Sequence, residues 1–145
     1  MYSHILIATD GSELAGKALT AGLELAKDFK SKVTVVTVTE PWSAVVTGEA
    51  ALGFPPAEYE KAAAENAAHI LSGAGEVARL GQVECATVHV KDRYPAEGII
   101  EAAKEHGCDL IVMASHGRRG LGRLLLGSEA VRVLTHSTGP VLICR

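Results

Sequence analysis

The stretch Met113–Glu129 holds the residues best suited to bind a ligand, because glycines and arginines are interspersed there between an apolar run and a helical one. Glycine lets backbone amides approach a ligand where a side chain would block them. Several such amides, gathered just before a helix N-terminus, form a site for anions. We expect Ser128 to cap the helix that follows and Gly127 to offer a bare amide. The stretch therefore predicts a phosphate site, with glycines at Gly117, Gly120, Gly122 and Gly127.

An alternative interpretation of the same stretch is a flexible surface loop, kept soluble by Arg118, Arg119 and Arg123. Glycine-rich motifs alone have many false positives. The choice between the two depends on what faces the loop.

Asp10 is the carboxylate that we expect to face it. It lies in the turn Thr9–Ser12, directly after the apolar run His4–Ala8. Such an acid can contact a ribose hydroxyl or hold a metal ion on a phosphate. The alternative is an Asp that caps a helix in a turn, which is common. We favour the ligand-binding role, because the glycine loop should lie opposite.

Several catalytic motifs are nearly matched. Gly127-Ser128 ends a pattern close to a P-loop, but the lysine before the serine is absent. Ser115 and His116 resemble part of a nucleophile elbow, yet Met113 replaces its first glycine. Neighbouring residues at a strand end need not face each other, so we expect no catalytic residue. No dinucleotide fingerprint follows the first apolar run, and the other histidines lack metal-ligand spacing.

Strand-like and helix-like segments alternate along the chain. The predicted strands are His4–Ala8, Val33–Val38, Val83–Val90, Leu110–Met113 and Val141–Cys144. The predicted helices are Leu14–Phe29 with Ser12 as its cap, Ala57–Leu80, a helix from Pro95 with Ile99, Ile100, Ala103 and His106 on its buried face, and Glu129–His136. The segment Glu40–Pro56 is predicted to be irregular.

This alternation predicts an α/β fold, in which a parallel sheet carries helices on both faces. Ligands bind such sheets beyond the carboxyl ends of the strands, where the strand order reverses. If the first and fourth strands are neighbours, the turns Thr9–Ser12 and Met113–Ser128 line one crevice.

Composition limits the remaining possibilities. The 145 residues are 48% hydrophobic, which suits one domain with a core. No apolar run reaches the roughly 18 residues of a membrane span, and the N-terminus lacks signal-peptide features. A net charge of −3 without a basic block argues against binding to nucleic acid. Cys85, Cys108 and Cys144 fit no zinc or disulfide pattern, so we expect small core residues in a reducing cytoplasm.

These residues resemble the universal stress protein family over essentially the full length. The segments that carry the resemblance are ILIATDGSE, VTVVTV, DLIVMASHGRRGLGRLLLGSEAVRVL and GPVLICR. Family members that bind ATP have the loop pattern G-x2-G-x9-G-[ST]. Here Gly117, Gly127 and Ser128 match it at the right spacing, whereas Ala114 replaces the first glycine.

The resemblance implies one nucleotide-binding domain over residues 1–145, with an open five-stranded, Rossmann-like parallel sheet in the order 3-2-1-4-5. It implies that Asp10 lies near the ribose and the metal, and that Ala8, Thr9 and Val38 line the adenine pocket. Met113, Ala114 and Gly117 would lie along the ribose and first phosphates, and the amides of Gly127, Ser128 and Glu129 at the terminal phosphates. The predicted site for ATP and Mg²⁺ is completed by Ser115, His116 and Arg118.

The resemblance also implies a homodimer built through Pro140–Cys144. We therefore expect a cytoplasmic, ATP-binding stress-response protein that acts as a nucleotide-dependent regulatory or partner-binding module, with no membrane or nucleic-acid partner. Two alternatives remain open. One is a slow ATPase or phosphotransferase, against which stands the lack of an obvious general base. The other is a dimeric scaffold that binds no nucleotide.

Overall fold

The computed structural model describes residues 1–118 and 125–145. Its elements, in chain order, are β1 (His4–Ala8), α1 (Glu13–Phe29), β2 (Lys32–Thr39), α2 (Trp42–Val45), α3 (Ala50–Gly53), α4 (Pro56–Leu80), β3 (Cys85–Lys91), α5 (Pro95–Glu105), β4 (Leu110–Ala114), α6 (Ser128–His136) and β5 (Val141–Cys144). Arg119, Gly120, Gly122 and Arg123 of the predicted phosphate loop lie outside the described residues.

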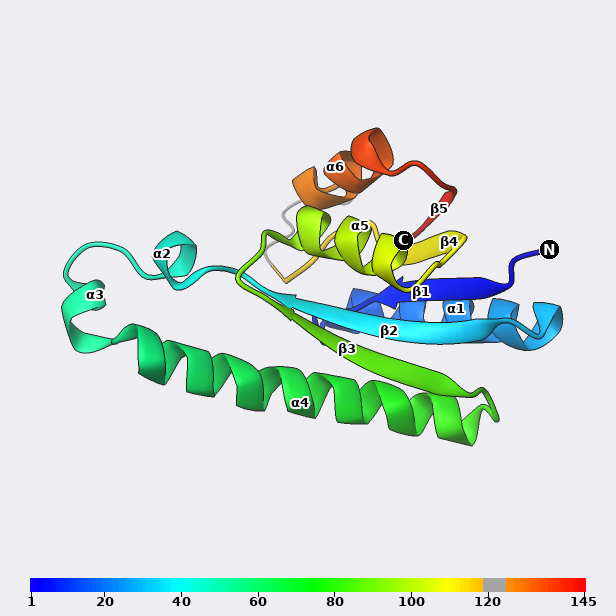
Figure 1. Ribbon diagram of the computed structural model, residues 1–145, viewed down its shortest axis with the longest axis horizontal. Helices are drawn as coiled ribbons and strands as arrows, with labels where there is room; N and C mark the ends of the chain where they lie inside the picture. Colours follow the sequence, from blue (N-terminus) through cyan, green and yellow to red (C-terminus); the bar gives the residue numbers. More distant parts are fainter. Residues whose placement is uncertain (119–124) are drawn as a thin grey trace.

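The strands form one parallel sheet in the order β3-β2-β1-β4-β5, which confirms the predicted fold class and strand order (Figure 1). β1 is central, with Ile7 in register with Val35 of β2 and Val112 of β4. Since β1 and β4 are parallel neighbours, the turns that follow Ala8 and Ala114 leave the same edge of the sheet. The turns after β1 and β4 therefore lie side by side, as the crevice expected from the sequence requires.

Helices cover both faces of the sheet, α1 and α4 on one and α5 and α6 on the other (Figure 1). Successive side chains of β1 serve the two layers in turn, with Ile5 and Ile7 in one cluster and Leu6 in the other, all fully buried. Gly22 lets α1 approach closely, because a Cβ there would lie 2.6 Å from Cδ1 of Ile7. The two packed layers hold the strand ends in a fixed position.

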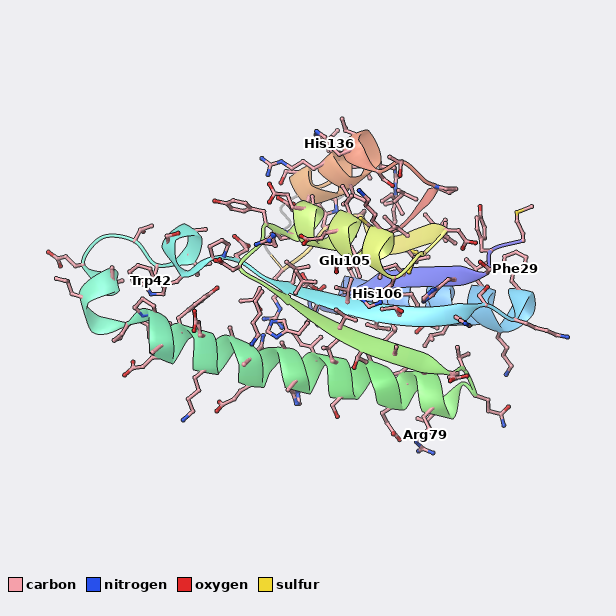
Figure 2. The ribbon with its side chains drawn as sticks, in the orientation of Figure 1. Phe29, Trp42, Arg79, Glu105, His106 and His136 are labelled. Carbon is pink, nitrogen blue, oxygen red and sulfur yellow. The ribbon has the colours of Figure 1, made fainter. Side chains whose placement is uncertain are left out.

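Several local predictions need correction. Gly127, in extended conformation, is the N-cap of α6, and Ser128 is the first helical residue and caps nothing. The amide of Gly127 is held by the carbonyl of Ser115, which fixes this boundary. His106 ends α5 as an exposed C-cap and is not part of its buried face, because the helix stops at Glu105 (Figure 2).

The segment between β2 and α4, predicted to be irregular, contains two short helices, α2 and α3. It projects beyond the sheet and carries Trp42 (Figure 2). Nε1 of Trp42 donates to the carbonyl of Phe54 at 2.8 Å, and the Tyr59 hydroxyl donates to the carbonyl of Glu40 at 2.7 Å. The cap predicted for α1 is confirmed, because Oγ of Ser12 accepts from an amide in its first turn.

The three cysteines are free thiols, each half-buried. Burial raises the pKa of Cys108 to about 11, and the nearby carboxylate of Asp109 adds to the effect. This thiol therefore stays protonated at neutral pH, as expected of a core residue. Among the described residues, no helix is long and apolar enough to cross a membrane.

Candidate functional site

A cavity of about 840 Å³ opens beyond the carboxyl ends of β1, β2 and β4. Every described residue that the resemblance implied for the nucleotide site lines it, namely Ala8, Thr9, Asp10, Val38, Met113, Ala114, Ser115, His116, Gly117, Arg118, Gly127, Ser128 and Glu129. The cavity also has walls that the sequence did not predict, among them Asn66, Ile70, Tyr94, Pro95 and Arg132. These come from α4, α6 and the start of α5, so only the fold brings them to the site.

Asp10 joins the two loops of the cavity. Its Oδ1 accepts from the amide of Ser12 at 2.9 Å, and its Oδ2 accepts from the amide of Arg118 at 2.8 Å. Asp10 therefore forms a local turn and faces the glycine loop as expected, while the cap of α1 is Ser12 and the ligand-binding role stays a prediction. Gly117 makes the second contact possible, because a Cβ there would lie 2.8 Å from Oδ2 of Asp10.

The N-terminus of α6 opens on the cavity. Gly127 donates its amide to the carbonyl of Ser115 at 2.8 Å, so this amide is occupied and not bare as predicted. No side chain caps the helix, and the amides of Ser128, Glu129 and Ala130 have no acceptor among residues 1–118 and 125–145. Unsatisfied amides at the positive end of a helix dipole attract an anion.

The side chain of Glu129 has two partners within the protein. Its Oε2 accepts from the amide of Ala96 at 2.8 Å, and Oε1 lies 3.5 Å from Nη1 of Arg132. Ala96 lies in the first turn of α5, so the carboxylate serves a helix that lacks a cap of its own. Glu129 thus lines the cavity, while its carboxylate joins α6 to the first turn of α5.

Ser115 and His116 do contact each other, although neighbouring residues at a strand end need not. Oγ of Ser115 lies 3.1 Å from Nδ1 of His116, and Ser115 is 4% exposed. The described residues hold no group of three His, Cys, Asp or Glu side chains that could bind a metal ion. Asp10 alone suits Mg²⁺ only where phosphate oxygens supply further ligands, as is usual for this ion.

Ala114, the departure from the loop pattern, is the last residue of β4 and is 8% exposed. Its φ is negative, because the non-glycine residues with positive φ among the described residues are Lys30, Gln82 and Asp92. The alanine therefore sits in the site without backbone strain. Gly127 is different, since a Cβ there would lie 3.0 Å from the carbonyl oxygen of Ser115.

The cavity residues at the strand ends have side chains on both faces of the sheet. Ala8, Val38 and Met113 pack with the α5 and α6 layer. Thr37 belongs to the opposite face, is 4% exposed and lines the cavity, and its hydroxyl has no partner among the described residues. Apolar side chains line the cavity from both layers, with Ala67 and Ile70 of α4 on the side opposite α5.

The chain matches the model of the Universal stress protein family over residues 1–145. It is 35% identical over 151 residues to the universal stress protein YxiE of Bacillus subtilis, covering 100% of each chain. Universal stress protein UspA from Lactobacillus plantarum has the same fold, with a TM-score of 0.84 at 23% identity, covering 99% of this chain and 98% of the other. So does the universal stress protein from Archaeoglobus fulgidus in complex with dAMP, with a TM-score of 0.70 at 23% identity and the same coverage. The chain belongs to the universal stress protein family.

Proposed function

We propose that this protein binds ATP with Mg²⁺ in the cavity and acts as a nucleotide-dependent regulatory module in the stress response. The observation that carries the proposal is the open N-terminus of α6, whose amides at Ser128 and Glu129 face a cavity that also holds Asp10. In this arrangement the terminal phosphates lie at the helix N-terminus. Asp10 lies toward the ribose and the metal ion.

The size and polarity of the cavity support a nucleotide. A volume of about 840 Å³ is in the range of small-molecule and cofactor sites. The cavity is lined by amides and the cations Arg118 and Arg132, and also by apolar residues such as Ala8 and Val38. A nucleotide likewise combines charged phosphates with a flat, largely apolar base. The Archaeoglobus fulgidus relative in complex with dAMP supports an adenine base.

A first experiment asks whether the purified protein carries a nucleotide. The protein is denatured, and the released ligand is identified by chromatography. Calorimetry with ATP and Mg²⁺ then measures affinity for the stripped protein. We expect ATP in both measurements. Absence of any nucleotide, together with no heat of binding, would favour the nucleotide-free scaffold.

A second experiment tests the N-terminus of α6 by removing one backbone amide hydrogen. Ser128→Pro removes the amide hydrogen at the first helical position, where proline is well tolerated. Gly127 has φ −63° and ψ 155°, a conformation that proline accepts in the residue before it. Ser128→Ala, the matched control, keeps the amide and removes only the hydroxyl. We expect Ser128→Pro to weaken ATP by about tenfold or more, since a hydrogen bond to a charged group contributes about 1.5–3 kcal/mol, and Ser128→Ala to weaken it less.

The second candidate function is a slow ATPase or phosphotransferase, and the contact between Ser115 and His116 is the observation in its favour. We nevertheless propose that turnover is negligible, because no described carboxylate is within hydrogen-bond distance of the His116 ring to orient it. Release of ADP over hours is the measurement. Several turnovers per minute, abolished in Ser115→Ala or His116→Ala, would promote the enzyme to first place.

A further inference from the structure

Tyr94 is an aromatic residue at the mouth of the cavity with nothing stacked on it. It lines both the cavity and the neighbouring groove between α5 and α6, and it is 44% exposed. The aromatic pairs among the described residues are Tyr2 with Phe29 and Phe54 with Tyr59. Tyr94 is the one Phe, Tyr or Trp among the described residues that line the cavity. A large ring at this place exposes apolar surface that a flat ligand can cover.

The packing of α5 explains why the ring lies there. Tyr94 is the N-cap of α5, and its carbonyl accepts from the amide of Gly98, one turn along the helix, at 2.9 Å. Gly98 is pressed against Val38, because a Cβ at Gly98 would lie 2.8 Å from both methyl groups of that valine. Tyr94 therefore lies one turn before Gly98, toward the N-terminus of α5, on the helix face that meets β2. That turn lies toward the carboxyl end of the strand, where the cavity opens.

Apolar residues line the cavity from both sides of the sheet, with Ala67 and Ile70 on the α4 side. Ala8, Val38 and Met113 pack with the α5 and α6 layer, which is the layer that Tyr94 joins. The phosphate end of the cavity, at Ser128, lies in the first turn of the neighbouring helix. In the sheet order, β1 separates the end of β2, where Val38 meets Gly98, from β4 and the loop that leads to Ser128. A nucleotide that extends across the strand ends from the amides of α6 thus brings its base toward Val38 and Tyr94.

We infer that Tyr94 forms a wall of the base subsite and stacks on the purine ring, with Val38 lining the same subsite. This inference rests on the proposed function and adds a residue that determines affinity for the base. Every nucleobase presents a π-face to an aromatic side chain, so the contact needs no hydrogen bond. The hydroxyl of Tyr94 has no partner in the described part of the chain. A phenylalanine at this position should therefore stack on the base as well as the tyrosine does.

The test compares two ligands that share the phosphates and differ in the base. Calorimetry measures the affinity of Mg²⁺-ATP and of Mg²⁺-tripolyphosphate for the parent, Tyr94→Ala and Tyr94→Phe. We expect Tyr94→Ala to weaken ATP by about tenfold while tripolyphosphate binds as before. Tyr94→Phe should bind both ligands within about twofold of the parent.

The control is Phe29→Ala, which removes an aromatic ring of similar exposure, 39%, at the opposite end of the molecule from the segment that carries Trp42 (Figure 2). It should leave both affinities unchanged, and thermal melts show whether each variant is folded. If Tyr94→Ala binds ATP as the parent does, or weakens both ligands equally, the base-wall role is wrong while the proposed function stands. If the parent binds no ATP, both fail together.

Discussion

The carboxylate of Asp10 accepts a hydrogen bond from the backbone amide of Arg118 at 2.8 Å, although 108 positions separate the two residues. This bond joins the turn after β1 to the glycine loop after β4. The other carboxylate oxygen is bonded to the amide of Ser12. An ionised carboxylate has about four lone-pair positions, so Asp10 keeps acceptor capacity for a ribose hydroxyl or a metal ion while it holds the loops together.

Changes at Asp10 should therefore separate its structural role from its proposed metal role. Asp10→Asn keeps one acceptor oxygen but loses the charge, and Asp10→Ala loses both. We expect Asp10→Asn to weaken ATP by about tenfold in the presence of Mg²⁺ and much less in EDTA, since a metal ion needs the charge. Asp10→Ala should weaken ATP in both conditions. Calorimetry is the measurement, and equal affinity for both variants and the parent would place the site elsewhere.

A second carboxylate, Asp109, predicts a dependence of stability on pH. It accepts from the amide and hydroxyl of Ser3, at 2.9 and 2.7 Å, and from the amide of His4 at 3.0 Å. Burial acts to raise the pKa of Asp109, but these hydrogen bonds outweigh it and hold the pKa below its usual range. The folded state therefore favours the charged carboxylate, and this contribution is present above the pKa of the unfolded chain and is lost as the pH falls through the folded value.

Asp109→Asn should lower the free energy of unfolding at about pH 6, by about 1 kcal/mol or less because the group is only partly buried. The difference from the parent should shrink at about pH 3, which is below the pKa of the carboxylate in the unfolded chain, and should vanish only below the lowered pKa of the folded state. Urea unfolding at the two pH values measures this. Asp28→Asn, an exposed change on α1, is the control. A difference that is the same at both pH values would show that the charge of Asp109 is irrelevant.

Sequence and structure agree best for features that depend on residues close together in the sequence. Apolar runs predicted the strands, and the resemblance of the loop from Gly117 to Ser128 to the family pattern implied which backbone lines the cavity. Side-chain partners were harder to predict. The carboxylate of Glu129 turns to Ala96, a residue 33 positions away, and nothing local to either residue signals that contact.

Tyr94 was missed for the same reason. Its place at the mouth depends on how closely Gly98 lets α5 approach Val38, which is a property of packing between distant segments. The boundary of α6 was misjudged because serine is a common N-cap. The bond from the Gly127 amide to the carbonyl of Ser115 decides that boundary, and it is visible only once the loop is folded.

Ala114 allows a test of the one position that departs from the loop pattern. Because its φ is negative, Ala114→Gly relieves no strain and only removes a methyl group from the cavity wall. We expect the variant to bind ATP more tightly by at most about tenfold, measured by calorimetry. Glycine in a strand should also lower stability by about 0.5–1 kcal/mol. If the parent binds no ATP and Ala114→Gly creates binding, the chain belongs with family members that bind no nucleotide.

The free edge of β5 is the remaining feature that calls for a partner. The amide of Ile111 donates to the carbonyl of Pro140 at 3.1 Å, and that of Ser115 to the carbonyl of Cys144 at 2.7 Å. Since backbone groups alternate along a strand, the amide and carbonyl of Ile143 point away from β4. Leu142 is 37% exposed on the same strand. An exposed strand edge favours pairing with a second chain, and a two-fold axis would let two copies of β5 pair antiparallel.

Ile143→Pro should therefore convert a homodimer into a monomer. Proline removes the outward amide of Ile143 and leaves the bonds between β4 and β5 in place, as at other strand edges. Deletion of Val141–Arg145 is a poorer test, because it also removes the carbonyl that holds the amide of Ser115 in the cavity. Ile143→Val is the matched control, since it keeps the amide and trims one methylene. Light scattering should give a dimer mass for the parent and Ile143→Val and a monomer mass for Ile143→Pro, with circular dichroism showing that all three are folded. A dimer mass for folded Ile143→Pro would place the interface on another surface, and a monomeric parent would remove the need for one.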